Sequence, residues 1–172
     1  MKSQTQNKDG QILIAYFSKT GNTRKVAEYI SRVTGGDLFE IKTVKSYPQE
    51  YRPTTEVARK ENNENARPEL AVNLNTIASY KIIFLGYPNW WGTMPMAFFT
   101  FLESHDLTGK TIIPFCTNEG SGLGHSIADI QRLCPGVAVK EGLALRGGNS
   151  GGSLNEVSAW LLRIGITSST GT

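Results

Sequence analysis

The stretch AYFSKTGNT, residues 15–23, joins an apolar run at residues 12–14 to a segment with the apolar spacing of a helix. An ordinary turn between a strand and a helix needs one capping side chain and one glycine. This turn is richer in polar groups, because Ser18, Thr20 and Thr23 carry hydroxyls around Gly21 and Asn22. The amides at a helix N-terminus are unpaired, and the helix dipole favours an anion there. The turn is therefore predicted to hold a phosphate; the alternative is a doubly capped turn without a ligand.

Two common phosphate-binding loops do not fit this turn. It lacks the pattern G-x-x-x-x-G-K-[ST], which excludes a Walker A loop, and it lacks G-x-G-x-x-G, which excludes a dinucleotide fingerprint. Hydroxyls and main-chain amides can hold a monophosphate without a lysine or magnesium. The expected ligand therefore carries a single phosphate.

Apolar runs alternate with helical patterns along most of the chain, which predicts an α/β fold with a parallel sheet of five strands and helices on both faces. The expected strands lie at residues 11–17, 38–42, 81–87, 111–116 and 137–145, and the expected helices at residues 23–34, roughly 53–63, 96–103, 126–133 and 155–164. Residues 11–166 are expected to form one domain, with a flexible leader at 1–10 and a polar tail at 167–172. Residues 43–80 are an elaborated crossover that could serve as an interface, a lid or solvated surface.

Composition excludes several classes of function. The 172 residues suit one domain, and the net charge of +3 is concentrated in residues 1–86, which hold 13 basic against 9 acidic side chains. Basic and aromatic residues are not interleaved, so no nucleic-acid partner is expected. No apolar window reaches the roughly 20 residues of a membrane span, and residues 1–10 lack the apolar region of a signal peptide. A cytoplasmic protein without a membrane partner is therefore expected.

The isolated cysteines and histidines do not predict a disulfide framework or a metal site. Cys116 ends an expected buried strand, and Cys134 lies near the end of an expected helix. Neither belongs to a C-x-x-C motif, and His105 and His125 have no ligand spacing around them. Both cysteines are therefore expected to be buried free thiols.

Two further loops follow expected strands. The first, GYPNWWGTMP at residues 86–95, places two adjacent tryptophans in a loop bounded by proline and glycine, where full exposure of both is costly. One indole is expected to contact a flat aromatic ligand and the other to pack inward, unless both cap the core. The second, CTNEGSGLGHS at residues 116–126, holds three glycines in five residues, which allow main-chain groups to approach a ligand edge, unless the loop is only a flexible connector. All three loops are expected to converge at the carboxyl ends of the strands.

With these loops placed, the chain resembles the flavodoxins. SKTGNT matches the FMN phosphate loop [ST]-x-T-G-x-T of that family at every specified position. The segments YPNWWGTMPMAFFTFLE and GKTIIPFCTNEGSGLG, together with YPQEY and RPEL in the crossover, are similar to the bacterial branch with a P-x-W-W-G loop. The resemblance covers residues 11–166. It implies a flavodoxin-like three-layer sandwich with strand order 2-1-3-4-5 and FMN at the carboxyl ends of strands one, three and four.

The resemblance also implies a set of cofactor-binding residues, and no catalytic or metal-binding ones. The phosphate would be held by Ser18, Lys19, Thr20, Gly21, Asn22 and Thr23. One side of the isoalloxazine would be lined by Pro88, Asn89, Trp90, Trp91 and Gly92. The other would be edged by Thr117, Asn118, Glu119, Gly120, Ser121 and Gly122.

The resemblance implies a low-potential electron carrier that uses the semiquinone and hydroquinone states of the flavin and docks on a larger redox protein. Two departures favour an alternative, an FMN-dependent NAD(P)H:quinone oxidoreductase. Residues 117–124 contain no aromatic side chain to stack on the flavin, and the chain is basic, whereas carrier flavodoxins are commonly acidic. A third possibility is a binding module that has lost its flavin. The expected assembly is a monomer or a weak dimer.

Overall fold

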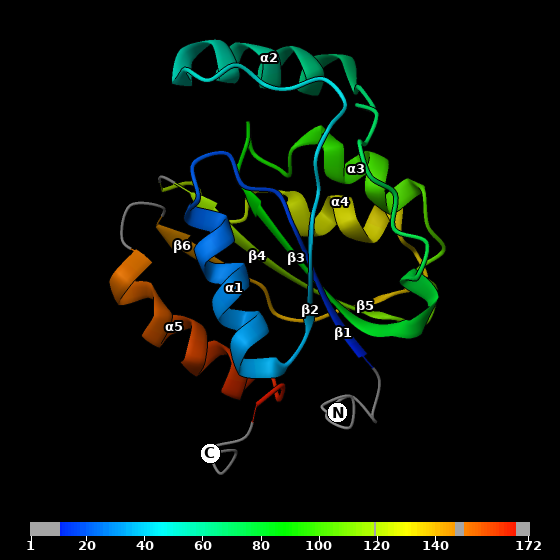
Figure 1. Ribbon diagram of the computed structural model, residues 1–172, viewed down its shortest axis with the longest axis vertical. Helices are drawn as coiled ribbons and strands as arrows, with labels where there is room; N and C mark the ends of the chain where they lie inside the picture. The colour runs from blue at the N-terminus through cyan, green and yellow to red at the C-terminus, as the bar shows by residue number, and fades with distance from the viewer. Residues whose placement is uncertain (1–10, 119, 147–149, 168–172) are drawn as a thin grey trace.

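The computed structural model describes residues 11–118, 120–146 and 150–167, which form a parallel sheet between two layers of helices (Figure 1). The strands are β1 (Gln11–Tyr16), β2 (Asp37–Glu40), β3 (Tyr80–Pro88), β4 (Thr111–Asn118), β5 (Ala138–Val139) and β6 (Leu143–Arg146). The helices are α1 (Asn22–Thr34), α2 (Tyr51–Glu64), α3 (Met96–Glu103), α4 (Ser126–Leu133) and α5 (Ser150–Arg163), with a short 3₁₀ turn η2 (Ile77–Ser79). The strand order is β2-β1-β3-β4-β5, as predicted, and β6 also pairs with β4.

The two faces of the sheet bury separate hydrophobic clusters, because successive side chains of a strand point to opposite faces. On β1, Leu13 belongs to the cluster that includes side chains of α3, and Ile14 belongs to the cluster that includes side chains of α1 and α5. On β3, Leu85 and Phe84 divide in the same way. This alternation produces the predicted three layers.

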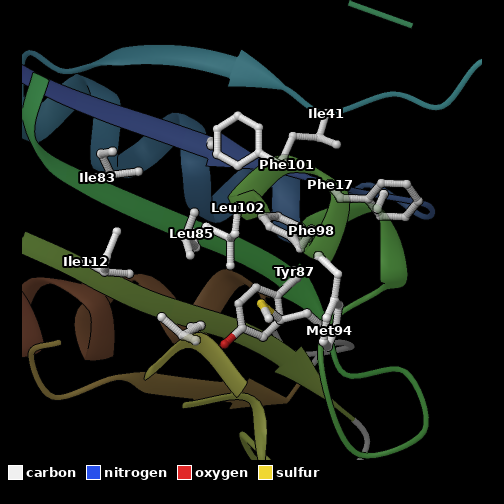
Figure 2. Close-up of a cluster of buried hydrophobic side chains, with 14 of the residues drawn as sticks. Phe17, Ile41, Ile83, Leu85, Tyr87, Met94, Phe98, Phe101, Leu102 and Ile112 are labelled. Carbon is white, nitrogen blue, oxygen red and sulfur yellow. The ribbon is translucent and has the colours of Figure 1, made fainter. Parts of the chain in front are cut away.

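The cluster under α3 extends to the carboxyl ends of the central strands. Figure 2 shows Tyr87 of β3 beside Phe98 of α3, and their ring centroids lie 5.4 Å apart in an edge-to-face arrangement. Phe17, the residue that follows β1, and Met94, which lies in the loop after β3, are also buried in this cluster. The core therefore continues beneath the loops that follow β1 and β3 and holds their bases in place.

The fifth predicted strand, residues 137–145, is wrong in one respect, because the structure divides it into β5 and β6. Pro114 of β4 lies between the residues that pair with the two pieces, and it has no amide proton to donate to a neighbouring strand. Gly142 lies in the gap between β5 and β6, where a Cβ would lie 3.1 Å from Pro114 Cγ and 3.0 Å from Leu123 Cδ1. Proline and close packing together interrupt the ladder.

The crossover at residues 43–80 contains the predicted helix, here α2, which spans 14 residues. In Figure 1, α2 lies apart from the other helices, beyond the end of the sheet where β1, β3 and β4 finish. Only two of its side chains, Thr54 and Ala58, are buried. Within the described residues, no helix is both long and apolar enough to cross a membrane.

Substitution of Gly86 tests the packing between β3 and β4. An added Cβ would lie 2.2 Å from Phe115 Cζ, so we expect Gly86→Ala to lower the free energy of unfolding by about 1–3 kcal/mol. Urea denaturation of Gly86→Ala in the wild-type background and in a Phe115→Leu background measures the effect. The smaller leucine side chain should relieve most of the penalty, and an equal penalty in both backgrounds would contradict this account.

Candidate functional site

The turn after β1 is stabilised by Ser18. Its Oγ accepts hydrogen bonds from the amides of Gly21, at 3.0 Å, and Arg24, at 3.2 Å. Gly21 precedes α1 with a φ of 100°, in the left-handed region that glycine adopts without strain. Because Ser18 Oγ accepts both bonds, its hydroxyl proton remains able to donate to a further acceptor.

The same turn presents donors that the rest of the described chain does not use. The main-chain amides of Thr20, Asn22 and Thr23 have no acceptor among the described residues. The first turn of α1 has no acidic residue, and the exposed Thr20 adds a hydroxyl. Unpaired amides at the positive end of a 13-residue helix form a site for an anion.

A buried pair of hydroxyls joins this turn to the loop after β4. Thr23 Oγ1 and Thr117 Oγ1 lie 2.9 Å apart, and both side chains are almost fully buried. One hydroxyl donates to the other, so one proton of the pair is left for another acceptor. Lys19, by contrast, reaches away to the crossover, where its Nζ donates to the main-chain oxygen of Gln49 at 3.3 Å.

The loop after β3 is a tight turn built on two left-handed residues. Trp91 has a φ of 57° and Gly92 a φ of 91°, and the flanking Trp90 and Thr93 form an isolated antiparallel bridge. A positive φ is strained for tryptophan, and such strain is concentrated at functional sites. Asn89 Oδ1 accepts a hydrogen bond from the Gly92 amide at 3.0 Å and so stabilises the turn.

The two indoles have different surroundings. Trp90 is half-buried against the α3 cluster, where its ring meets Phe17 edge-on at 5.3 Å. Trp91 is 52% exposed, and its Nε1 donates to the main-chain oxygen of Thr55 in α2 at 3.1 Å. Trp90 therefore packs inward, as expected for one of the pair.

The loop after β4 is organised by one amide side chain. Asn118 Oδ1 accepts hydrogen bonds from the amides of Gly120 and Gly122, and Asn118 Nδ2 donates one to the main-chain oxygen of Leu145. The glycines have φ values of 131° and 66°, which a residue with a Cβ rarely adopts. Ser121 between them is exposed, and Glu119 lies outside the described residues.

The loops after β3 and β4 contact each other directly. Asn89 Nδ2 donates to Gly122 O at 2.7 Å, and the His125 amide donates to Gly92 O at 2.8 Å. Gly124 approaches Gly92 so closely that an added Cβ would lie 2.1 Å from its carbonyl oxygen. Together with the Thr23–Thr117 pair, these contacts bring the three predicted loops together at one edge of the sheet.

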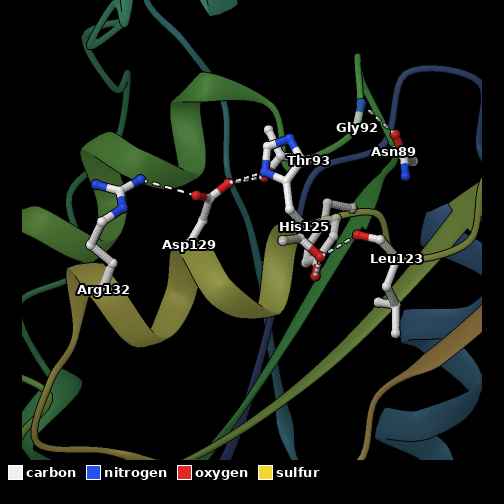
Figure 3. A network of polar contacts seen from close by, with 9 residues as sticks. Asn89, Gly92, Thr93, Leu123, His125, Asp129 and Arg132 are labelled. Carbon is white, nitrogen blue, oxygen red and sulfur yellow. Dashed lines mark hydrogen bonds and ion pairs between the residues drawn. The ribbon is translucent and has the colours of Figure 1, made fainter.

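A carboxylate beside these loops was not identified from the sequence. Asp129 Oδ2 accepts from Thr93 Oγ1 at 2.5 Å and lies 3.1 Å from His125 Nδ1, while Arg132 contacts Oδ1 at 3.0 Å (Figure 3). Burial opposes ionisation of Asp129, but the bonds from Thr93, Arg132 and His125 outweigh it and lower the pKa of the carboxyl below its usual value. The i, i+4 spacing of His125 and Asp129 was the available signal, and it is common on helix surfaces.

The cysteines are free and buried, as predicted. Burial raises the pKa of the Cys116 thiol to about 12 and that of Cys134 to about 11. Both thiols therefore stay protonated at neutral pH and are poor nucleophiles. Among the described residues, no group of three histidine, cysteine, aspartate or glutamate side chains could hold a metal ion.

The sheet order and the two helical layers define a flavodoxin-like α/β fold, and the candidate anion site lies at the start of α1. The family model for flavodoxin matches residues 11–164, so the chain belongs to the flavodoxin family. No curated protein matches the chain.

Solved structures support this assignment. A protein from Bacteroides eggerthii, provisionally named a flavoprotein, is 33% identical with a TM-score of 0.77, over 92% of this chain and 99% of that one. A similarly named protein from Bacteroides uniformis is 30% identical with a TM-score of 0.73, over 87% and 98%. A Lactobacillus acidophilus flavoprotein in complex with FMN is 24% identical with a TM-score of 0.69, over 88% and 98%, and shows the fold.

Asp129→Asn tests the polar network in Figure 3. The variant should lower the free energy of unfolding by about 1–3 kcal/mol at pH 7, because the bonds to a buried charge are lost. Folding lowers the pKa of the Asp129 carboxyl. The stability that the ionised carboxylate contributes is therefore complete above the unfolded pKa of about 3.9 and is lost as the pH falls through the folded pKa. Denaturation from pH 7 to pH 3 should therefore show the gap to wild type narrowing below about pH 4. A constant gap would contradict the assignment, and Glu56→Gln on the exposed face of α2 is the control.

Proposed function

We propose that this chain binds FMN at the carboxyl ends of β1, β3 and β4 and acts as a low-potential electron carrier. The observation that carries the proposal is the set of unused donors at the start of α1. Three main-chain amides and the Thr20 hydroxyl surround a helix N-terminus that has no carboxylate in its first turn. A phosphate monoester supplies the acceptor oxygens and negative charge that this arrangement stabilises.

The residues present fit FMN by the chemistry of their donors. Ser18 and Thr20 add hydroxyls to the amides, and nothing lies within 4 Å of the position of a Cβ on Gly21, which leaves the turn open on that side. On the ring side, residues 88–92 supply two indoles, and residues 117–122 supply glycine backbone and the Asn118 amide. When bound, FMN would supply the redox chemistry, and the protein would supply binding and electrostatics.

The chain's own residues would orient the ligand and restrict water. Asn89 and Asn118 hold the backbone of the two ring-side loops through their side-chain amides, so these loops are ordered by hydrogen bonds within the protein. The Thr23–Thr117 pair ties the phosphate turn to the loop after β4. Such preorganisation reduces the cost of ordering groups on binding. The Lactobacillus acidophilus flavoprotein, which shares the fold, was solved with FMN, and this supports the same ligand here.

FMN and riboflavin titrations test the role of the phosphate. Quenching of flavin fluorescence by the apoprotein should show FMN binding at least about 100-fold more tightly than riboflavin, since charge-assisted hydrogen bonds contribute about 1.5–3 kcal/mol each. Thr20→Val should weaken FMN by about tenfold and leave riboflavin unchanged. Thr111→Val, at the amino end of β4, is the matched control. Equal affinity for the two flavins would refute the phosphate site, and a protein that binds neither would favour a module without flavin.

His125 favours a second function, an FMN-dependent NAD(P)H:quinone oxidoreductase. Asp129 lies at Nδ1 of the imidazole, and the ring lies against Gly92, where Nε2 would be 3.2 Å from an added Cβ. The His125 side chain is 63% exposed, so its Nε2 is accessible to a ligand beside the loop after β3. Two-electron reduction of a quinone by NAD(P)H consumes one proton, and a carrier has no such requirement.

Steady-state oxidation of NADPH with a soluble quinone separates the two functions. As a carrier, the FMN-loaded protein should show no sustained turnover until a separate reductase protein is added. Sustained turnover by the protein alone, reduced by His125→Gln but not by His105→Gln at the opposite end of the sheet, would establish the reductase instead.

A further inference from the structure

Three aromatic rings from distant parts of the chain meet beneath the loop after β3. Phe17 and Tyr47 lie 5.7 Å apart, Phe17 and Trp90 5.3 Å, and Tyr47 and Trp90 5.2 Å, with interplanar angles of 78–88°. Each pair is edge-to-face, the arrangement that aromatic quadrupoles favour. Phe17 immediately precedes the phosphate turn, and Trp90 belongs to the loop after β3. Tyr47, from the crossover, therefore bridges the bases of two loops of the candidate site.

Tyr47 is in turn held by α2. Its hydroxyl donates to Glu61 Oε1 at 2.7 Å, and both side chains are half-buried. Burial raises the pKa of the Tyr47 phenol. Burial also raises the pKa of the Glu61 carboxyl, although the hydrogen bond from Tyr47 and the charge of Lys45 both act to lower it. The phenol therefore stays protonated at neutral pH and remains the donor of the hydrogen bond to the Glu61 carboxylate. If a partly buried carboxylate loses this donor, the free-energy cost of its desolvation is no longer offset by the hydrogen bond.

The same helix reaches the second indole. Trp91 Nε1 donates to Thr55 O, and the Arg59 guanidinium lies 5.9 Å from the centre of the Trp91 ring. Glu61 and Thr55 thus connect α2 to both tryptophans, one through Tyr47 and one directly. These contacts join α2, which has only two buried side chains and lies beyond the end of the sheet, to the loop after β3.

The structure assigns Tyr47 and Glu61 as positioning residues for Trp90. The hydrogen bond fixes the phenol ring, the phenol ring fixes the indole against Phe17, and the crossover thereby supports the loop after β3 from the core side. Neither residue is required to touch the ligand. The consequence for flavin binding rests on the proposed function, whereas the placement of the indole in the free protein does not.

Fluorine NMR of protein labelled with 5-fluorotryptophan tests the placement without any flavin. The chain has three tryptophans, and single Trp→Phe variants assign the resonances. Tyr47→Phe and Glu61→Ala should each shift the Trp90 resonance and increase its broadening by a soluble paramagnetic agent. Trp160, fully buried in the other cluster, should not change and so reports an intact fold. Glu61→Gln keeps an acceptor for the phenol and should restore the wild-type Trp90 resonance.

Two exposed residues of α2 provide matched controls, Tyr51→Phe and Glu56→Ala, which should leave all three resonances in place. A Trp90 resonance that is unchanged in both Tyr47→Phe and Glu61→Ala would overturn the assignment. So would equal effects of Glu61→Gln and Glu61→Ala. If the Trp160 resonance also moves in Glu61→Ala, the comparison of Tyr47→Phe with Tyr51→Phe decides the question.

Flavin titration of the same variants tests the consequence for the site. The FMN dissociation constant should rise about tenfold in Glu61→Ala and recover in Glu61→Gln, as expected when one aromatic pair is lost. Loss of FMN binding by the wild type would refute the proposed function while leaving the NMR result to stand. Wild-type affinity in a Glu61→Ala protein whose Trp90 resonance has moved would show that the indole is positioned for another purpose, and the inference for the site would fail.

Discussion

Parallel pairing of β1, β3 and β4 is the constraint on which the rest of this structure depends. Parallel strands finish at the same edge of a sheet, so the loops that follow them must meet there. Tyr16 lies beside Gly86, and Pro88 lies beside Thr117, which places the three strand ends within one hydrogen-bonded ladder. Every contact of the candidate site is built on this alignment.

The loops keep their shapes through internal hydrogen bonds. Asn89 satisfies one main-chain amide and one carbonyl, and Asn118 satisfies two amides and a carbonyl. Paired backbone groups cost less to bury than unpaired ones, so loops of this kind can border a ligand without collapsing on it. The turn after β1 differs, because several of its amides stay unpaired within the described chain, and this difference is what makes the turn the candidate anion site.

The crossover adds a second level of organisation. Tyr47 and α2 lie far from the phosphate turn in the sequence, yet they contact both tryptophans of the loop after β3. Trp90 thereby gains an aromatic partner at the edge of the core, and Trp91 gains a hydrogen-bond acceptor in α2, while neither indole is fully buried. The segment thus functions as more than a connection between β2 and β3.

Local patterns were sufficient for much of the fold. Alternating apolar runs and helical spacing located α1, α3 and α4 within a residue or so of their observed bounds, because amphipathic helices and buried strands leave periodic signals. The fifth strand was divided because Pro114 and Gly142 act across the sheet, and no local pattern shows which residues lie opposite each other.

The alternation of strands and helices by itself determined a parallel sheet with three polar loops at the ends of apolar strands, whereas the strand order came from the resemblance to the flavodoxins and was confirmed by the structure. Only the tertiary structure decided that Ser18 caps its own helix, that His125 and Asp129 lie beside Gly92, and that Tyr47 meets Trp90. These are contacts between side chains separated in the chain, and they depend on distances that composition and spacing do not encode. Local periodicity specifies elements, whereas the partners of a polar or aromatic side chain are specified only when the elements pack.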